Sequence, residues 1–432
     1  MIFAILAALL PVFIILGIID FRFHNYFWPD FDYFRIFHPF AMFDFFSILD
    51  AFVMIVALAA TISIIFNILK KRDLDYFKEF RWIYLAILFI GCGVIAAKGF
   101  YYPVEPMIKS FWFQSYINYV SPVVLFLSIL FGIRNKKFLN ILIKSVTITF
   151  AVFAVVCMFE YFTGLLPGES VDFLGRLAWP YIDPFFGMKV ESANYLSYLF
   201  GPVCVLSAVS VSLKKLKKSW LEILCFILCG TALILTKSYT GIGITFAIVA
   251  YIFFINIPKK AKVWMVVICM TIAGIFIATQ WNTRKFQILL GHYGQENSIE
   301  RRAQIYTFNS EAFLRMPISG IGPGNYQNFF RQNVEDFTGF TIPEIEIPPH
   351  PHNIAIAFWS DLGILGLIGI FIIYVGVLFE SFFRKGEKKL SSMYFLVPLY
   401  FLGHGLLDLP YGTDENSIMF WAFLAIAFIF KA

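Results

Sequence analysis

The chain has few charged residues and few cysteines for its length. Only 14% of its 432 residues are charged, against about 25% in an average soluble domain, and 59% are hydrophobic. This balance excludes an ordinary soluble globular protein. The six cysteines all fall inside apolar runs, where thiols behave as small hydrophobic groups, so we predict neither a disulfide nor a metal site from them.

Apolar runs close to the roughly 20 residues that cross a bilayer recur along the whole chain. They leave no stretch typical of a separate soluble domain, so we predict a single membrane domain over residues 1–432. Its fold class is all-α, a polytopic integral membrane protein of about 12 transmembrane helices. Residues 1–20 lack a basic leader and a small-residue cleavage site, which predicts a retained first span. The predicted spans are 2–19, 47–69, 82–97, 113–133, 138–162, 193–213, 220–236, 241–257, 263–281, 353–380, 390–407 and 417–430.

Basic residues are concentrated in alternate connectors between these spans. The basic connectors lie at 70–81, 134–137, 214–218, 259–262 and 384–389. Because short basic connectors stay on the cytoplasmic side of a membrane, this alternation predicts a multi-pass protein with both termini cytoplasmic. The net charge of +6 is therefore a topology signal, and we expect membrane lipids and no nucleic acid as partners.

The outer connectors are longer and richer in aromatic residues than the inner ones. The largest is 282–352, between spans nine and ten, and we predict that it forms a large loop containing short amphipathic helices. A helix over 299–316 is predicted from apolar residues at three- and four-residue spacing, namely Ile305, Phe308, Ala312 and Met316. Pro317 and the glycines that follow it end this helix.

A histidine-rich sequence joins this outer loop to span ten. His350, Pro351, His352 and Asn353 lead into a span with glycines at three-residue steps. A histidine at such a boundary meets water and exchanges protons near neutral pH, as a general base must. The glycines predict close approach by a neighbouring helix, which would hold the histidine firmly. The alternative is an interfacial histidine on a tightly packed helix.

Arginines on the outer side form a second group, which cytoplasmic retention does not explain. A guanidinium group matches phosphate oxygens and stabilises the charge that a diphosphate develops as its bond to sugar breaks. We expect a few of these arginines to bind phosphate and the others to pair with acidic neighbours in water. They are Arg176, Arg284, Arg301, Arg302, Arg315 and Arg331.

Polar residues within or near the apolar runs form a third group. Several lie near span ends, so we expect them to reach water and not to act in catalysis. Asp30 and Asp32 form an Asp-x-Asp pair in the first outer loop, a doublet that could hold a divalent cation against a phosphorylated donor. One such pair in an aromatic loop is weak evidence for a bound cation, and we predict no metal site. The intramembrane residues are Asp50, Glu160, Glu222 and His404.

Two of these motifs resemble the O-antigen ligase and lipid-linked glycan polymerase superfamily of bacterial inner membranes. Its ligases place glycines at three-residue steps after a histidine and an asparagine, which is similar to His352, Asn353, Gly363, Gly366 and Gly369. Its upstream signature of an arginine, an aromatic residue, a proline and a glycine-rich turn resembles Arg302, Tyr306, Pro317, Gly320, Gly322, Gly324 and Tyr326. Tyr306 stands where tryptophan is more usual.

A third resemblance precedes span six, where Gly187 and Asn194 are similar to a glycine and an asparagine that lead into a span of that family. The chain departs from the family after span seven. The family commonly carries a Thr-x-Ser-Arg turn there, whereas this chain has Tyr239 in place of the arginine. Contact with a donor phosphate then falls to Lys237 or Arg176, or is not made.

The resemblance implies a metal-independent, inverting glycosyltransferase with no cofactor, on the periplasmic face of the bacterial inner membrane. Its donor would be an undecaprenyl diphosphate-linked glycan, and its acceptor a hydroxyl group of a lipid or glycan. By that likeness His352 is the catalytic base and Arg302 a catalytic phosphate partner. The substrate-binding residues would be Arg176, Lys237, Asn194, Arg301, Asn353, His350 and Tyr306.

Three functions remain open at this point. An O-antigen ligase that attaches chains to lipid A-core is favoured, because the histidine-to-glycine spacing fits the ligases closely. A repeat-unit polymerase of the same superfamily shares the motifs and uses another lipid-linked repeat as its acceptor. A transporter or flippase is a more remote alternative, since polar residues collect at the outer edge and no pair of broken spans stands out.

Overall fold

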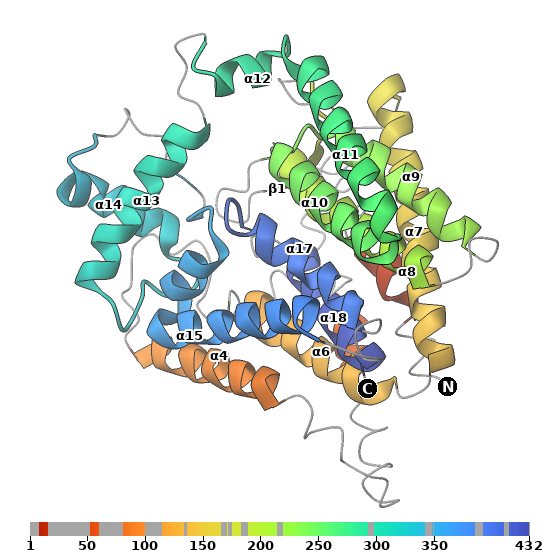
Figure 1. Ribbon diagram of the computed structural model, residues 1–432. Coiled ribbons are helices and arrows are strands. Elements are labelled where there is room, and N and C mark those ends of the chain that lie inside the picture. Colours follow the sequence, from red (N-terminus) through yellow and green to blue (C-terminus); the bar gives the residue numbers. More distant parts are fainter. Residues whose placement is uncertain are drawn as a thin grey trace, which may run out of the picture.

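The computed structural model describes residues 8–15, 52–59, 81–99, 115–133, 136–165, 171, 175–182, 189–213, 219–292, 298–341, 348, 350–384, 392–409 and 414–431. Most of this part is helical, and Figure 1 shows helices packed side by side in a bundle. Apolar side chains from most of these helices form one large buried cluster. The prediction of an all-α, multi-pass membrane protein is confirmed.

Every predicted span from 82–97 onward coincides with a helix. These helices are α4 (Arg81–Gly99), α6 (Ser121–Gly132) after the short π-helix η2 (Tyr116–Val120), α7 (Lys136–Thr163), α8 (Ala193–Leu213), α9 (Trp220–Leu235), α10 (Tyr239–Asn256), α11 (Lys259–Gln280), α15 (Ile354–Phe382), α17 (Leu396–His404) after the 3-10 turn η4 (Met393–Phe395), and α18 (Asp414–Lys431). Five of the described helices, α7, α8, α10, α11 and α15, are long and apolar enough to cross a membrane. The total of about 12 spans stays a prediction, because only 8–15 and 52–59 of the first two are described.

A short antiparallel hairpin precedes α8. Its strands are β1 (Trp179–Ile182) and β2 (Lys189–Ser192), and Trp179 pairs with Ser192. Because β2 runs directly into Ala193, the hairpin sets the position of the first turn of α8. Sequence reasoning did not predict these strands, since four-residue strands carry little periodicity.

Helix α4 packs closely along α15 at Gly369, which the sequence singled out, and at Gly376, which it did not. A Cβ atom on Gly369 would lie 2.7 Å from the Cγ1 atom of Ile90, and one on Gly376 would lie 2.5 Å from the ring of Trp82. Such distances are far below van der Waals contact, so only glycine allows this approach. The predicted close helix packing is confirmed.

Gly363 breaks α15 within its length. Its φ of 68° is left-handed, and a Cβ atom there would lie 2.0 Å from the carbonyl oxygen of Ile318. The glycine-rich turn after Pro317 fills the break. The amide of Gly322 donates to the carbonyl of Ser360 at 2.9 Å, and the amide of Ile364 donates to that of Ile318 at 3.0 Å. The turn therefore supplies partners for backbone groups that the break leaves free.

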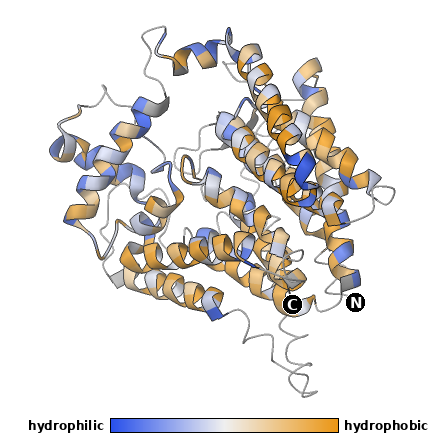
Figure 2. Cartoon of the chain, viewed as in Figure 1, coloured by the Kyte–Doolittle hydropathy of each residue, from blue (hydrophilic) through white to orange (hydrophobic). Residues whose placement is uncertain are grey.

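Residues 282–352, predicted to be an outer loop and called the outer segment here, contain α12 (Arg284–Leu289), α13 (Ser298–Arg315) and α14 (Tyr326–Thr338). Figure 2 shows more hydrophilic residues on these helices than on the bundle. Helix α13 confirms the predicted helix over 299–316, and its apolar residues Ile305, Phe308 and Ala312 are buried. Phe308 and Ala312, together with residues of α14, form a second hydrophobic cluster that includes Trp359 of α15. The outer segment is thereby attached to the bundle beside the break at Gly363.

Candidate active site

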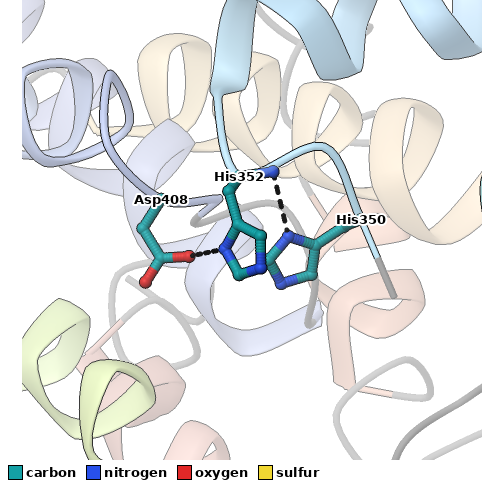
Figure 3. Close-up of side chains that lie close together, drawn as sticks. All are labelled: His350, His352 and Asp408. Carbon is teal, nitrogen blue, oxygen red and sulfur yellow. Dashed lines mark hydrogen bonds and ion pairs between the residues drawn. The ribbon is translucent and has the colours of Figure 1, made fainter. Parts of the chain in front are cut away.

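A histidine and a carboxylate meet where α15 begins and α17 ends. The Nδ1 atom of His352 lies 3.0 Å from the Oδ1 atom of Asp408. A dashed line marks this contact in Figure 3. The His352 side chain is 26% exposed, whereas that of Asp408 is 6% exposed. The imidazole is therefore accessible to a substrate, and the carboxylate is shielded behind it.

The charge on Asp408 fixes the tautomer of His352. Burial raises the pKa of Asp408, but the hydrogen bond with His352 and the charges of the two histidines and Arg302 outweigh burial and hold this pKa well below its usual range. An ionised carboxylate only accepts hydrogen bonds, so Nδ1 of His352 must carry the proton. In the neutral imidazole the lone pair is then on Nε2, which is the atom that accepts a proton in a general base.

A hydrogen-bond chain extends from Asp408 to the turn between α9 and α10. The Nδ2 atom of Asn194 donates to Oδ2 of Asp408 at 2.6 Å, and its Oδ1 atom accepts from the hydroxyl of Ser238 at 2.8 Å. Asn194 is the second residue of α8, so the hairpin before α8 holds it in place. The chain links three of the regions that the sequence motifs marked and orients the carboxylate that orients His352.

The backbone at His352 adopts an uncommon conformation that neighbouring groups stabilise. Its φ is 50°, in the left-handed region that is costly for residues other than glycine. The hydroxyl of Tyr306 donates to the carbonyl of His352 at 3.1 Å. Asn353 caps α15 by accepting from the amides of Ala355 and Ile356, and its Nδ2 atom donates to the carbonyl of Leu406 at 2.9 Å. Tyr306 and Asn353 thus hold the turn that presents the imidazole.

His350 packs against His352. Their ring centroids are 4.2 Å apart, and the Nδ1 atom of His350 accepts from the amide of His352 at 3.3 Å. Burial, followed by the neighbouring His352, lowers the pKa of His350 to about 3. His350 is therefore neutral at physiological pH and supports the turn without adding charge.

Arg302 lies on α13, one helical turn before Tyr306. Its charge acts on His350, Asp408 and Tyr306, so the guanidinium group lies close to the histidine pair. The Nε atom is buried and has no hydrogen-bond partner among the described residues. A buried donor without a partner is costly, which indicates that an anion or a water satisfies it.

A second group of cations surrounds the turn before α10. The Nζ atom of Lys237 donates to the carbonyl of Gly175 at 2.9 Å, beside Arg176. Lys285, from α12, donates to the carbonyl of Lys237 and places its Nζ atom 4.5 Å from the ring centre of Tyr239. Tyr239 stands where the family that the sequence resembles carries an arginine. A lysine from another helix, Lys285, reaches this point.

Other sequence candidates lie apart from the histidine pair or outside the described residues. Arg301, Arg284 and Arg331 are exposed on the outer helices, and Arg315 packs over the ring of Phe337 at 4.1 Å. Glu160, Glu222 and His404 are buried inside the bundle, so the expectation that they reach water is wrong. The side chain of His404 is used in packing, against Tyr198 and Tyr400. Asp30, Asp32, Asp50 and Gly187 lie outside the described residues.

Sequence reasoning missed three residues of the site: Asp408, Ser238 and Lys285. Asp408 is 56 residues from His352, and no local spacing connects the two. The available signal was its position, since it is an acidic residue immediately after an apolar run that ends at the outer side. Ser238 and Lys285 belong to no spacing pattern in the sequence, so their roles emerge only from contacts.

Comparison with known families finds a match. Residues 224–371 match the family model described as O-antigen ligase. The matched region runs from α9 into α15 and includes Lys237, Arg302 and His352. No curated protein sequence matches the chain. The match over residues 224–371 shows that this region of the chain is similar to the O-antigen ligase family.

Proposed function

We propose that the protein transfers a glycan from undecaprenyl diphosphate to an acceptor hydroxyl on the periplasmic face of the bacterial inner membrane. Lipid A-core is the acceptor that we favour, which would make the protein an O-antigen ligase. The reaction inverts the configuration of the transferred sugar and requires neither a metal ion nor another cofactor. The family match supports a glycosyltransferase-like enzyme of the O-antigen ligase type. The donor, the acceptor and the mechanism are what this proposal adds.

The observation that carries the proposal is a pair of groups: a histidine base fixed by hydrogen bonds, and an arginine whose buried Nε donor has no partner among the described residues. His352 is oriented through Asp408 and Asn194, with Nε2 left to accept a proton. Arg302 lies nearby with a buried donor that has no partner among the residues described. A base and an anion-binding group in this arrangement suit a reaction in which a hydroxyl loses a proton and a phosphate gains charge.

In the proposed step, Nε2 of His352 takes the proton from the acceptor hydroxyl as its oxygen attacks the anomeric carbon. The bond between that carbon and the diphosphate oxygen breaks, and its electron pair leaves with the diphosphate. Arg302 stabilises the charge that develops on the leaving group. Because attack and departure occur on opposite sides of the carbon, the configuration inverts. Asp408 keeps its charge throughout and stabilises the imidazolium.

The other predicted site residues divide into two roles in this proposal. Asn194, His350 and Tyr306 position the base through hydrogen bonds to Asp408 or to the backbone of His352. Asn353 positions it by capping α15 and donating to the carbonyl of Leu406. Arg176 and Lys237 bind the diphosphate farther from the base, together with Lys285. Arg301 is exposed next to Arg302 and contacts the outer part of the glycan or its carrier.

The site's position supports the proposed side of the membrane. The outer ends predicted from the basic connectors include the starts of α8, α10 and α15 and the end of α17. Asn194, Ser238, His352 and Asp408 come from these four ends and form one hydrogen-bond chain. Labelling of single cysteines introduced in 282–352 with a membrane-impermeant reagent on intact spheroplasts tests this side. Modification from the inside only would contradict the proposal.

Reconstitution decides the reaction itself. Purified protein in liposomes, supplied with a defined undecaprenyl diphosphate-linked glycan and lipid A-core, should form a covalent product in the presence of EDTA. His352→Ala should abolish it, and His292→Ala, at an exposed histidine of the outer segment, should not. Loss of turnover in EDTA that Mg²⁺ or Mn²⁺ restores would contradict the metal-free reaction.

The repeat-unit polymerase differs only in its acceptor, so the same assay separates it from a ligase. A product that grows on a second lipid-linked repeat, with no transfer to lipid A-core, would identify a polymerase. In cells lacking the gene, free core with long chains retained on the carrier indicates a ligase. Core bearing a single repeat indicates a polymerase.

The break in α15 raises the question of transport, because discontinuous helices often line substrate paths. Here the turn from Ile318 to Gly322 fills the break and hydrogen-bonds its free backbone groups. Asp361, next to the break, accepts a hydrogen bond from the hydroxyl of Tyr119 at 2.7 Å. These partners favour a structural break over a path. Covalent transfer by the purified protein would remove the transporter alternative.

A further inference from the structure

Three metal-ligating side chains meet at the candidate active site. One ligand atom each from His350, His352 and Asp408 lie within 4.8 Å of one another. Figure 3 shows the two imidazole rings and the carboxylate converging from the turn before α15 and the end of α17. The hydrogen bonds that fix this turn hold the three groups together before any ligand arrives.

The donor set suits a first-row transition ion. Imidazole nitrogen and carboxylate oxygen bind Zn²⁺ at about 2.0–2.2 Å, and three protein ligands with one water form a common zinc coordination. Mg²⁺ and Ca²⁺ prefer oxygen ligands and would bind two histidines poorly. The partial exposure of the His352 side chain gives an ion access to the cluster.

We propose that His350, His352 and Asp408 form an inhibitory Zn²⁺ site. Coordination by His352 removes the lone pair that a base needs, whichever ring nitrogen binds the ion. Binding to Nε2 occupies the lone pair directly, and binding to Nδ1 moves the proton to Nε2. Asp408 exchanges its hydrogen bond with the imidazole for a bond to zinc. The inhibitory part rests on the proposed function, whereas the binding part does not.

Arg302 gives the proposal a directional test. Its positive charge acts on His350 and Asp408, so it opposes a divalent cation in the cluster. Arg302→Gln should therefore tighten Zn²⁺ binding by about threefold or more. A substitution that only loosened the fold would weaken binding instead. In the transfer assay the same variant should lose activity, so the two readouts move in opposite directions.

The binding experiment uses the full-length protein in detergent, purified with a tag that contains no histidine. Isothermal titration with Zn²⁺ should show one bound ion, and Mg²⁺ should show none. His350→Gln and Asp408→Asn should each weaken the affinity at least about tenfold. His292→Gln removes an exposed histidine elsewhere in the outer segment and should leave the affinity unchanged. Absence of binding, or equal affinity in wild type and His350→Gln, would overturn the proposal.

Inhibition is measured separately. Transfer in liposomes should fall as Zn²⁺ is added and recover with EDTA, and His350→Gln should need a higher Zn²⁺ concentration for the same loss relative to its own starting rate. Zn²⁺ binding without inhibition would refute the inhibitory role, but the proposed Zn²⁺ site itself would stand. Failure of all transfer, with binding intact, would count against the proposed function alone. If His350→Gln unfolds, Asp408→Asn and Arg302→Gln still decide the site by titration.

Discussion

The two sides of the candidate active site differ in how their polar groups are held. On one side His352, Asp408 and Asn194 bind each other, and the turn that carries the imidazole is fixed by Tyr306 and Asn353. On the other side Arg302 keeps a buried donor without a partner in the described structure. The proton-accepting side is held by hydrogen bonds within the protein, whereas the Arg302 side keeps a donor for an anion or a water.

This difference follows from what each side must do. A base must hold one atom in one orientation before the substrate arrives, so its geometry is built from protein hydrogen bonds. A phosphate partner must keep donors free, because donors already satisfied by the protein have less to offer a charge that develops later. The proposed reaction therefore predicts the largest loss of activity when the base itself is removed, and smaller losses when Asp408 or the cationic side is changed.

The largest effect is expected from His352→Ala. Loss of a general base lowers transfer by 10²- to 10⁴-fold in typical enzymes, and we expect a loss of about 10³-fold here. Asp408→Asn should cost less, about 10²-fold, because the imidazole remains but its tautomer is no longer fixed. Initial rates in liposomes with the defined donor provide the measurement. Equal activity of His352→Ala and wild type would remove the base from the mechanism.

Arg302→Gln should lower transfer by about 10²-fold, since one positioned donor to a developing anion contributes roughly this much. Arg302→Lys keeps the charge but lacks the planar guanidinium, and we expect it to recover only part of the loss. The comparison is made at saturating donor, so that weaker binding and slower chemistry are told apart. If Arg302→Gln raised KM without changing kcat, Arg302 would bind the ground state only.

Gly363→Ala tests the joint between the two sides. A Cβ atom there would meet the carbonyl oxygen of Ile318 at 2.0 Å, in a residue whose φ is 68°. The turn that carries α13, and with it Arg302, would have to shift, and we expect about 2–4 kcal/mol of destabilisation. Gly243→Ala is the matched control, because nothing lies within 4 Å of a Cβ atom at that helical glycine. Thermal unfolding in detergent should separate the two variants.

Acid should weaken the fixed side first. Folded His350 has a pKa of about 3, whereas an unfolded histidine takes up a proton near pH 6.5, so the unfolded state binds more protons below that pH. Stability from this group is present above pH 6.5 and falls by up to about 1.4 kcal/mol per pH unit as the pH drops toward 3. Asp408, whose pKa is lowered on folding, adds a loss only below about pH 4. His350→Gln should flatten the dependence between pH 6.5 and 4.5; an unchanged slope would contradict the assignment.

The smallest effect is expected at the second cation group. Lys285→Ala removes the Nζ atom over the ring of Tyr239, and we expect a 3- to 10-fold rise in the KM for the lipid-linked donor. Lys262→Ala, in the first turn of α11, is a control with a similar lysine-over-ring contact, to Phe254. A donor KM that is unchanged in Lys285→Ala would remove this group from the diphosphate site.

The sequence by itself determined the helices and the residue types of the site. Long apolar runs must form helices in a bilayer because every backbone group needs an internal partner, so most predicted spans coincide with observed helices. The spacing of the three glycines in span ten predicted close packing by a neighbouring helix. The spacing of apolar residues predicted the helix over 299–316, since side-chain direction repeats along a helix. His352 and Arg302 were found because their residue types at an outer boundary are unusual.

Only the tertiary structure decided which groups meet. The pairing of His352 with Asp408 joins residues from different helix ends, and periodicity along one helix carries no information about the end of another. The same holds for the turn after Pro317, which enters the break at Gly363, and for Lys285, which reaches Tyr239 from α12. Local sequence specifies the conformation of a segment, but contacts between segments depend on how the whole bundle packs.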